Sequence, residues 1–285
     1  MSTNPSLSLN LIEDIRQLTT FPFMVNALEA GTIVAVLAAI TGWYMVLRRQ
    51  AFAGHTLSVM AFPGAAGAAL IGIPASLGYY IACGAAALTM RGAGRARTSS
   101  RSAETAAIGT IQATGLAAGF LFLSLNHQVL GGPETLLFGT FLGISSGQVL
   151  GLLAIGACAL AALALCARPL LLATLDPEVA QARGVPVGAL DLGFLLILAA
   201  TVATTSQITG ALLVFALLVA PPAAAQKLTV RPLPSLGLSI VFALLVVWLG
   251  LGIAYFSPYP VGFWTTTIAA GLFLLAAGWA RLARS

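Results

Sequence analysis

The chain has 285 residues, of which 59% are hydrophobic and only 7% are charged, and its mean hydropathy is +0.99. A soluble domain carries roughly a quarter of its residues as Asp, Glu, Lys or Arg. This composition therefore excludes a soluble enzyme, a disordered chain and a receptor with a single anchor. One bilayer-spanning helix takes about 20 apolar residues, so we expect a multi-pass protein of a cell membrane, embedded in the lipid bilayer.

Apolar runs bounded by charges or by Pro and Gly predict nine transmembrane helices in an all-α bundle, within a range of eight to ten. The second and third runs are short and are separated only by Ile73-Pro74, so re-entrant or broken helices are the alternative there. The first 24 residues lack the features of a signal peptide and are expected to form an extracytoplasmic segment, 1–24, before a single transmembrane domain, 25–282. The predicted spans are 25–47, 55–73, 75–90, 104–124, 148–167, 188–206, 208–226, 235–254 and 263–281.

The basic residues provide an independent test of the number of spans. Nine spans with an outside N-terminus place every basic residue except Arg16, out of 13, in cytoplasmic loops or the cytoplasmic C-terminal tail. Cytoplasmic loops of membrane proteins carry an excess of Lys and Arg, which predicts an N-terminus outside and a C-terminus in the cytoplasm. Topology thus explains the net charge of +5, and no nucleic-acid partner is expected.

Ionisable residues within spans are functional candidates, because charge is costly in lipid. His55 is the candidate metal ligand, since a neutral imidazole is a common zinc ligand; the alternative is a helix cap at the membrane interface. Glu29 and Asp191 either line a polar pathway or sit at an interface. His127 and Glu134 lie in an outer loop and are candidates for contact with an external binding protein; a solvated loop is the alternative.

No catalytic motif is supported by its context. Residues 143–147, GISSG, match the GxSxG nucleophile pattern, but that motif requires a strand-to-helix turn, and a hydrolase would need Ser145 to pair with His127. The GxxxxGK[ST] phosphate loop is missing from the sequence, so ATP hydrolysis by that device is not expected in this chain. The three cysteines form no CxxC pair and are interpreted as packing residues. We expect a non-catalytic subunit with no permanently bound cofactor.

The loop 168–187 contains a pattern typical of a short, isolated helix. Asp176 is a preferred N-cap, Pro177 suits the first helical position, Glu178 falls in the first turn, and Gly184 suits the position after the last residue. These signals predict a helix near 174–185 on the cytoplasmic face between two spans. A helix there could dock a cytosolic motor subunit through Asp176, Glu178 and Arg183; an ordinary surface helix is the alternative.

Five segments, in order from about residue 22 to 282, resemble the membrane permease subunits of ATP-binding-cassette importers for zinc, manganese and iron. They are RRQAFAGHTLS at 48–58 with PG at 63–64, ETAAIG at 104–109, DPEVA at 176–180 with Gly184, ITGALLV at 208–214 through APPAA at 220–224, and PVG at 260–262.

The resemblance fails at one functional position. The family typically has Gly-Asp at the start of the second span and a histidine four residues later, and it implies that these two side chains hold the metal. Here the aspartate position is His55 and the histidine position is Val59. Ligation by nitrogen alone favours zinc over the oxygen-loving manganese, so zinc is the expected cargo, and a manganese or iron importer of the same class is the alternative.

The resemblance also implies the partners and the mechanism. Two cytosolic ATP-binding subunits would drive a homodimer, or a heterodimer with a similar chain, and an extracytoplasmic metal-binding protein would deliver the ion. Hydrolysis on the separate subunit would switch the pathway between outward and inward access. A secondary transporter driven by an ion gradient is the competing class, but it should show more carboxylates within its spans.

Overall fold

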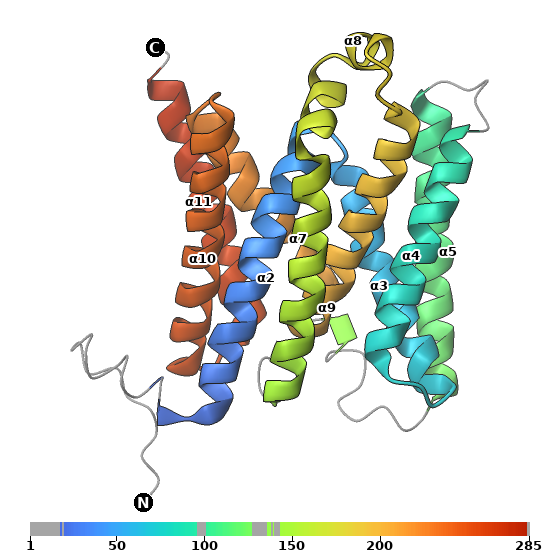
Figure 1. The fold of residues 1–285 in the computed structure, drawn as a ribbon. Helices are drawn as coiled ribbons and strands as arrows, with labels where there is room; N and C mark the ends of the chain where they lie inside the picture. Colours follow the sequence, from blue (N-terminus) through green and yellow to red (C-terminus); the bar gives the residue numbers. More distant parts are fainter. Residues whose placement is uncertain are drawn as a thin grey trace, which may run out of the picture.

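The computed structural model describes residues 18, 20–95, 101–126, 136, 137, 139 and 143–283, without the side chains of 93–95, 101–105 and 212. Within these ranges all regular secondary structure is helical, as the composition predicted (Figure 1). His127, Glu134 and most of the predicted N-terminal segment lie outside the described residues. The long helices are α2 (Pro22–Leu47), α3 (Ala51–Leu70), α4 (Ala75–Arg95), α5 (Arg101–Leu125), α7 (Ser146–Leu175), α9 (Val187–Leu228), α10 (Pro232–Tyr255) and α11 (Val261–Leu282), and the short helix α8 (Pro177–Ala182) lies between α7 and α9.

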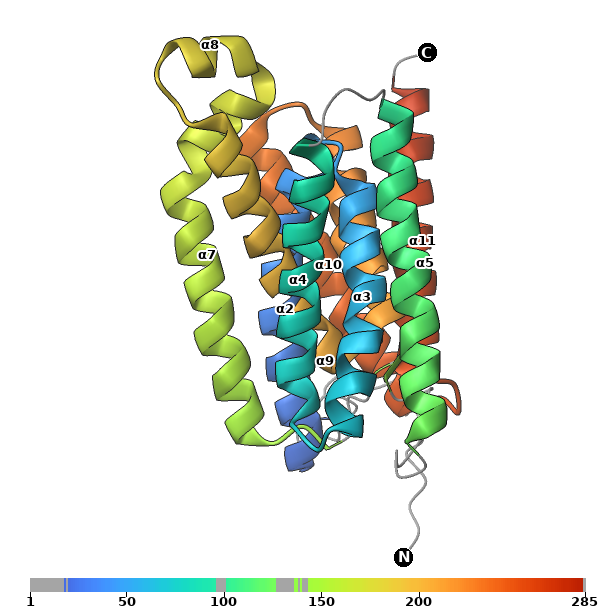
Figure 2. The ribbon, with the colours of Figure 1, turned by 90° about the vertical axis from the view of Figure 1, so that its right-hand side faces the viewer.

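Six segments of the described chain are long and apolar enough to cross a membrane by length and composition. They are Pro22–Leu47, Ala106–Leu125, Ser146–Leu175, Val187–Ala211, Pro232–Tyr255 and Val261–Leu282, and Leu213–Leu228 is a shorter apolar helix. The helices run side by side as a bundle, and α8 projects beyond one end of it (Figures 1 and 2). Exposed leucine, isoleucine and phenylalanine side chains on several helices suit contact with lipid acyl chains.

Helix α9 is broken at Gly210, where the backbone has φ 75° and ψ 162°. Asp191 and Gln226, near the two ends of α9, both contact the C-terminal end of α2. The break lies against Gly139, which shares a cavity with Met24 at the opposite end of α2. The first half of α9 therefore runs along α2 in one direction, reverses at Gly210, and returns in its second half.

The core lies where α2 packs against the two halves of α9, and it combines small residues with larger aliphatic and aromatic ones. Ala38, Leu198 and Val202 are fully buried there, and the hydroxyls of Thr41 and Thr201 lie 3.1 Å apart across the same contact. Because lipid removes the hydrophobic driving force between helices, close packing and interhelical hydrogen bonds supply the association energy.

Helices α3 and α4 are continuous over 20 and 21 residues, so the alternative of short broken helices is wrong for this pair. They are joined by a four-residue turn. Their backbones come close together at Gly64 and Gly78, where a Cβ atom on either residue would clash with the carbonyl oxygen of the other. Pro63, within α3, does not end the helix. Figure 2 shows α3, α4 and α5 side by side.

Candidate functional site

The predicted short helix is present as α8, six residues from Pro177 to Ala182. Asp176 is its N-cap, and a carboxylate oxygen accepts a hydrogen bond of 3.0 Å from the backbone N–H of Val179. Gly184, just past the helix end, has φ +77°, a left-handed conformation that glycine adopts without steric cost. A short helix therefore lies between the two predicted capping residues, Asp176 and Gly184, and it is shorter than the predicted range 174–185.

Helix α8 presents charge outward and anchors itself with one small residue. Ala180 is fully buried, whereas Glu178 and Arg183 are exposed at the end of the bundle. The helix packs on α7 and α9, the two helices that it connects. An exposed, charged and rigidly capped helix at this position is suited to contact another protein.

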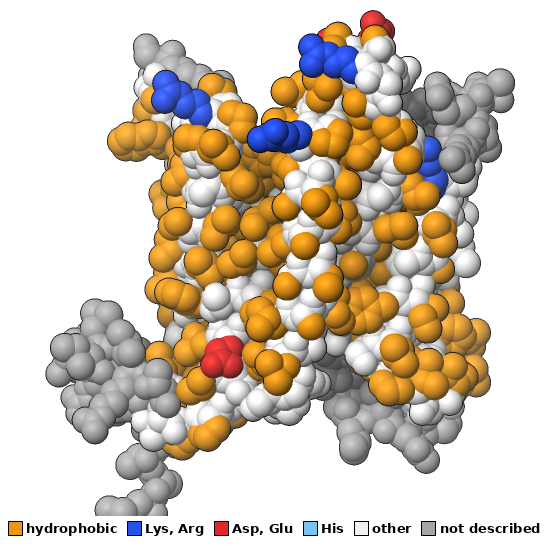
Figure 3. All heavy atoms as spheres, viewed as in Figure 1, with side chains coloured by type: hydrophobic (Ala, Val, Ile, Leu, Met, Phe, Trp, Pro, Cys, Tyr) orange, Lys and Arg blue, Asp and Glu red, His pale blue; other side chains and the backbone are white. Residues whose placement is uncertain are grey.

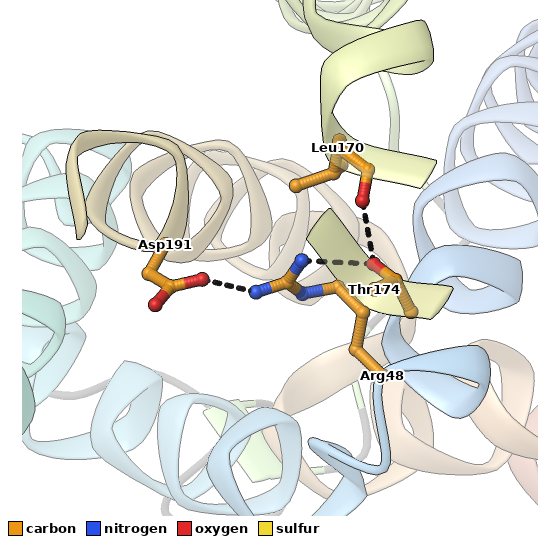
Figure 4. A network of polar contacts seen from close by, with 4 residues as sticks. All are labelled: Arg48, Leu170, Thr174 and Asp191. Carbon is orange, nitrogen blue, oxygen red and sulfur yellow. Dashed lines mark hydrogen bonds and ion pairs between the residues drawn. The ribbon is translucent and has the colours of Figure 1, made fainter. Parts of the chain in front are cut away.

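A buried arginine contacts both of the long helices that α8 connects (Figure 4). Arg48, the C-cap of α2, has a side chain that is 8% exposed and forms an ion pair with Asp191 of α9. Its second terminal nitrogen donates to the Thr174 hydroxyl of α7 over 3.0 Å, and that hydroxyl donates to the Leu170 carbonyl over 2.6 Å. The guanidinium also lies 5.2 Å from the centroid of the Phe194 ring. The carboxylate of Asp191, a predicted pathway residue, is thus paired with Arg48.

His55 lies one turn inside α3, not at its end. The helix begins at Ala51 with Gln50 as N-cap, so the interpretation of His55 as a helix cap is wrong. Its ring meets the Phe215 ring of α9 with centroids 4.8 Å apart, and its Nδ1 atom is buried without a hydrogen-bond partner. Val59, one turn further on, is buried. Because this nitrogen has no hydrogen-bond partner, it is free to bind a metal ion.

A group of buried polar side chains in the first half of α9 was missed by the sequence reasoning. Tyr80 of α4 lies 3.1 Å from the Thr204 hydroxyl, and the Gln207 amide donates to the Tyr80 oxygen over 3.0 Å. Thr205 and Ser206 are buried and their hydroxyls have no partner. The run TTSQIT at 204–209 was the available signal, but it was treated as a boundary between spans.

The remaining candidates are not brought together with His55. Glu29 is exposed on the side of α2, while Asp191 lies at the α8 end of the bundle. Ser145, the centre of the GxSxG pattern, is the N-cap of α7 and forms a capping box with Gln148. Its hydroxyl accepts from the Gln148 N–H over 3.3 Å, which explains the serine by helix capping.

The possible metal ligands of the described residues lie apart from one another. Among the described residues, the structure shows no group of three or more His, Cys, Asp or Glu side chains placed to hold a metal ion. Basic side chains gather near the α8 end on the face drawn in Figure 3, and hydrophobic side chains cover much of the rest of that face. This face of the bundle therefore combines a charged end near α8 with largely apolar sides.

This combination of an apolar helical bundle and a projecting capped helix defines a multi-pass membrane transport subunit. Residues 20–279 match the model of the ABC 3 transport family, and the chain belongs to that family. It is accordingly a membrane permease of the ATP-binding-cassette class, and the predicted resemblance is confirmed in this respect.

Two curated relatives and one solved structure illustrate the likeness. The manganese transport system membrane protein MntC of Halalkalibacterium halodurans is 30% identical over 94% of this chain and 90% of that protein. The chelated iron transport system membrane protein YfeC of Yersinia pestis is 32% identical over 78% of this chain and 74% of that protein. The structure of PsaBC from Streptococcus pneumoniae in complex with Fab superimposes with a TM-score of 0.82 at 25% identity, covering 93% of this chain and 95% of that chain.

Proposed function

We propose that this chain is the permease subunit of an ATP-driven importer of a first-row divalent metal, with manganese or iron as the cargo. The two relatives described above carry manganese and chelated iron in their names. The zinc cargo expected from His55 has no support from those relatives and stays a prediction. In this mechanism the chain forms the translocation pathway, and a separate subunit hydrolyses ATP.

The observation that carries the proposal is the position and chemistry of α8. It is capped at both ends, exposes Glu178 and Arg183, and projects from the bundle between two long helices (Figure 1). A motor subunit that docked here would act on α7 and α9 at once, because α8 packs on both. Rigid docking lets a nucleotide-driven movement of the partner bias the pathway between two arrangements.

We also propose nine membrane crossings, with the α8 end in the cytoplasm. The two halves of α9 run in opposite directions, so eight long helices supply nine segments. Helix α2 begins at the end of the bundle opposite to that at which α11 ends (Figure 1), as an odd number of crossings requires. The excess of basic residues at the α8 end supports its cytoplasmic assignment. Those whose side chains are described are Arg48, Arg49, Arg91, Arg168, Arg183, Lys227, Arg231 and Arg281.

The opposite end of the bundle is the proposed docking end for an extracytoplasmic metal-binding protein. The turn between α10 and α11 there carries Tyr259, which is 59% exposed, and borders a cavity of about 420 Å³ beside Met24 and Gly139. Aromatic side chains are favoured at membrane–water interfaces and at protein contacts. His127 and Glu134 remain predicted contacts of that partner.

A second copy of the chain is proposed to complete the pathway. His55 provides one nitrogen donor, whereas structural and transport sites for transition metals use several ligands. A homodimer would bring two such residues to one pathway, and the exposed Glu29 on α2 would be covered better by protein than by lipid.

The decisive experiment is uptake of radioactive manganese, iron and zinc by the complex reconstituted in proteoliposomes with its ATP-binding subunit and binding protein. We expect ATP-dependent uptake of manganese or iron at a rate above that of zinc. Uptake of zinc alone would reverse the cargo assignment. Uptake that persists without the ATP-binding subunit would overturn the motor-driven mechanism in favour of a secondary transporter.

Reversing the charge of α8 is expected to weaken its contact with the motor. In the D176K/E178K variant the cap and both acidic charges are lost, and we expect less ATP-binding subunit to co-purify per permease. In D176S/E178Q the serine keeps the cap while the charges are removed, so the two variants separate cap from charge. The exposed Ser124→Ala change on α5 is the control. Equal co-purification in all three variants would argue against docking at α8.

The proposed orientation predicts which side of the membrane can label single cysteines. After Cys83, Cys158 and Cys166 are replaced by alanine, a cysteine at Arg183 should react with an impermeant maleimide only from the cytoplasmic side. A cysteine at Tyr259, exposed at the other end, should react only from outside. The opposite pattern would invert the topology, and reaction of both from one side would exclude an odd number of crossings between them.

A further inference from the structure

We propose that Arg48 is a positioning residue that transmits movement of the α8 connection to the corner between α2 and α3. This inference rests on the proposed function, since it assumes that a motor moves α8. The Arg48 side chain contacts both helices that flank α8, and Arg48 lies in the turn between α2 and α3, seven residues before His55.

Arg48 holds the two ends of the α8 connection at the same time. Thr174, which accepts its hydrogen bond, lies two residues before the N-cap Asp176. Asp191, its ion-pair partner, lies in the first turns of α9, after α8 has ended. The Arg48 side chain is 8% exposed and that of Asp191 is 33% exposed, so water screens the pair only in part. A displacement of either helix therefore changes a contact of the guanidinium.

The corner that carries Arg48 is stiff. The backbone N–H groups of Arg48, Arg49 and Gln50 donate to carbonyls of residues 44–46 over 2.9–3.0 Å. Arg49 has φ 57°, a left-handed conformation that is uncommon outside glycine and closes the turn. Helix α3 starts at the next residue but one, and His55 lies one turn further. Movement of Arg48 therefore carries the start of α3 with it.

The corner also has polar atoms that this arrangement leaves unpaired. The Nε atom of Arg48 and the Oε1 atom of Gln50 are buried and lack hydrogen-bond partners. A buried donor and a buried acceptor without hydrogen-bond partners lower the stability of the arrangement that leaves them unpaired. They fit an element that has a second arrangement, in which the corner has shifted and these atoms gain partners.

The test is the coupling ratio of the assembled complex, measured as metal ions transported per ATP hydrolysed. Asp191→Asn removes the ion pair. Thr174→Val removes the bond from Arg48 to α7, together with the bond from the Thr174 hydroxyl to Leu170 within α7, while keeping the side-chain shape. We expect ATP hydrolysis within about twofold of the unmodified complex, while uptake falls at least fivefold. Thr110→Val is the matched control, because the Thr110 hydroxyl is exposed and bonds only within its own helix in the described contacts.

A second readout follows the movement itself. Spin labels at Val179 in α8 and Phe52 in α3, both exposed, report the change in their separation between nucleotide-free and nucleotide-bound complexes. In the variants we expect the nucleotide-dependent change at this pair to differ from that in the unmodified complex, because α3 no longer follows α8.

Three outcomes are distinguishable. A reduced coupling ratio together with a changed label response supports the inference. An unchanged coupling ratio in both variants overturns the inference. A loss of uptake and hydrolysis to the same extent, together with a lower unfolding temperature, also overturns it and leaves Arg48 a structural residue. Failure of the unmodified complex to show any ATP-dependent uptake overturns the proposed function, and this inference falls with it.

Discussion

Replacing Gly210 with alanine is expected to be among the most destabilising single substitutions in the chain. At φ 75° and ψ 162° the backbone occupies a region that is essentially restricted to glycine, and a side chain there costs about 1–3 kcal/mol. The chain at Gly139 passes close to the same point, since a Cβ atom added to Gly139 would lie 2.5 Å from the Gly210 nitrogen. The fraction of monodisperse protein remaining after heating in detergent measures the effect.

The matched control is Gly193→Ala in the same helix. Gly193 has helical geometry, and an added Cβ atom would meet nothing within 4 Å. Alanine there should leave the unfolding temperature unchanged or raise it, since alanine favours a helix over glycine by up to about 1 kcal/mol. Equal unfolding temperatures for the two variants would show that the reversal of α9 does not depend on the glycine conformation.

Replacing His55 with phenylalanine is expected to lower metal uptake by at least about tenfold, equivalent to about 1.4 kcal/mol. The substitution keeps an aromatic ring beside Phe215 but removes the nitrogen donor, so packing changes less than ligand chemistry. Initial rates of uptake in proteoliposomes measure the effect, with the unfolding temperature as the check on packing. Uptake kinetics equal to those of the unmodified chain would return His55 to a packing role.

The double variant H55D/V59H tests the same position in the opposite direction. It installs the aspartate and histidine that the family resemblance implies at these two places. A carboxylate oxygen favours manganese more than imidazole nitrogen does, so we expect the ratio of manganese to zinc uptake to rise. A ratio unchanged from that of the native chain would mean that residues 55 and 59 do not select the cargo.

The helical fold and the order of its segments could be predicted because lipid imposes simple requirements. Every backbone polar group in a bilayer must be satisfied internally, so long apolar runs become helices, and each predicted span overlaps an observed helix. The α8 boundaries were predictable for a different reason. Capping by Asp176 and Gly184 is local chemistry that acts within a few residues.

Boundaries set by tertiary contacts were less predictable. The start of α3 was predicted at residue 55 but lies at Ala51, because the preceding turn is closed by backbone hydrogen bonds and not by a capping side chain. The division of the late apolar region was predicted at Gln207, whereas the break falls at Gly210. A polar residue suggested the boundary, but the requirement for positive φ decided it.

The sequence by itself determined that this protein is a membrane-embedded helical bundle, which end of it is rich in basic residues, and where one short capped helix lies between two spans. These features depend on composition and on local chemistry. Only the tertiary structure decided that Asp191 pairs with Arg48, 143 residues away, that the His55 ring meets the Phe215 ring edge-on, and that α9 turns back on itself. The physical reason is that such contacts form between helices brought together by packing, and no short-range pattern in the chain encodes which surfaces will meet.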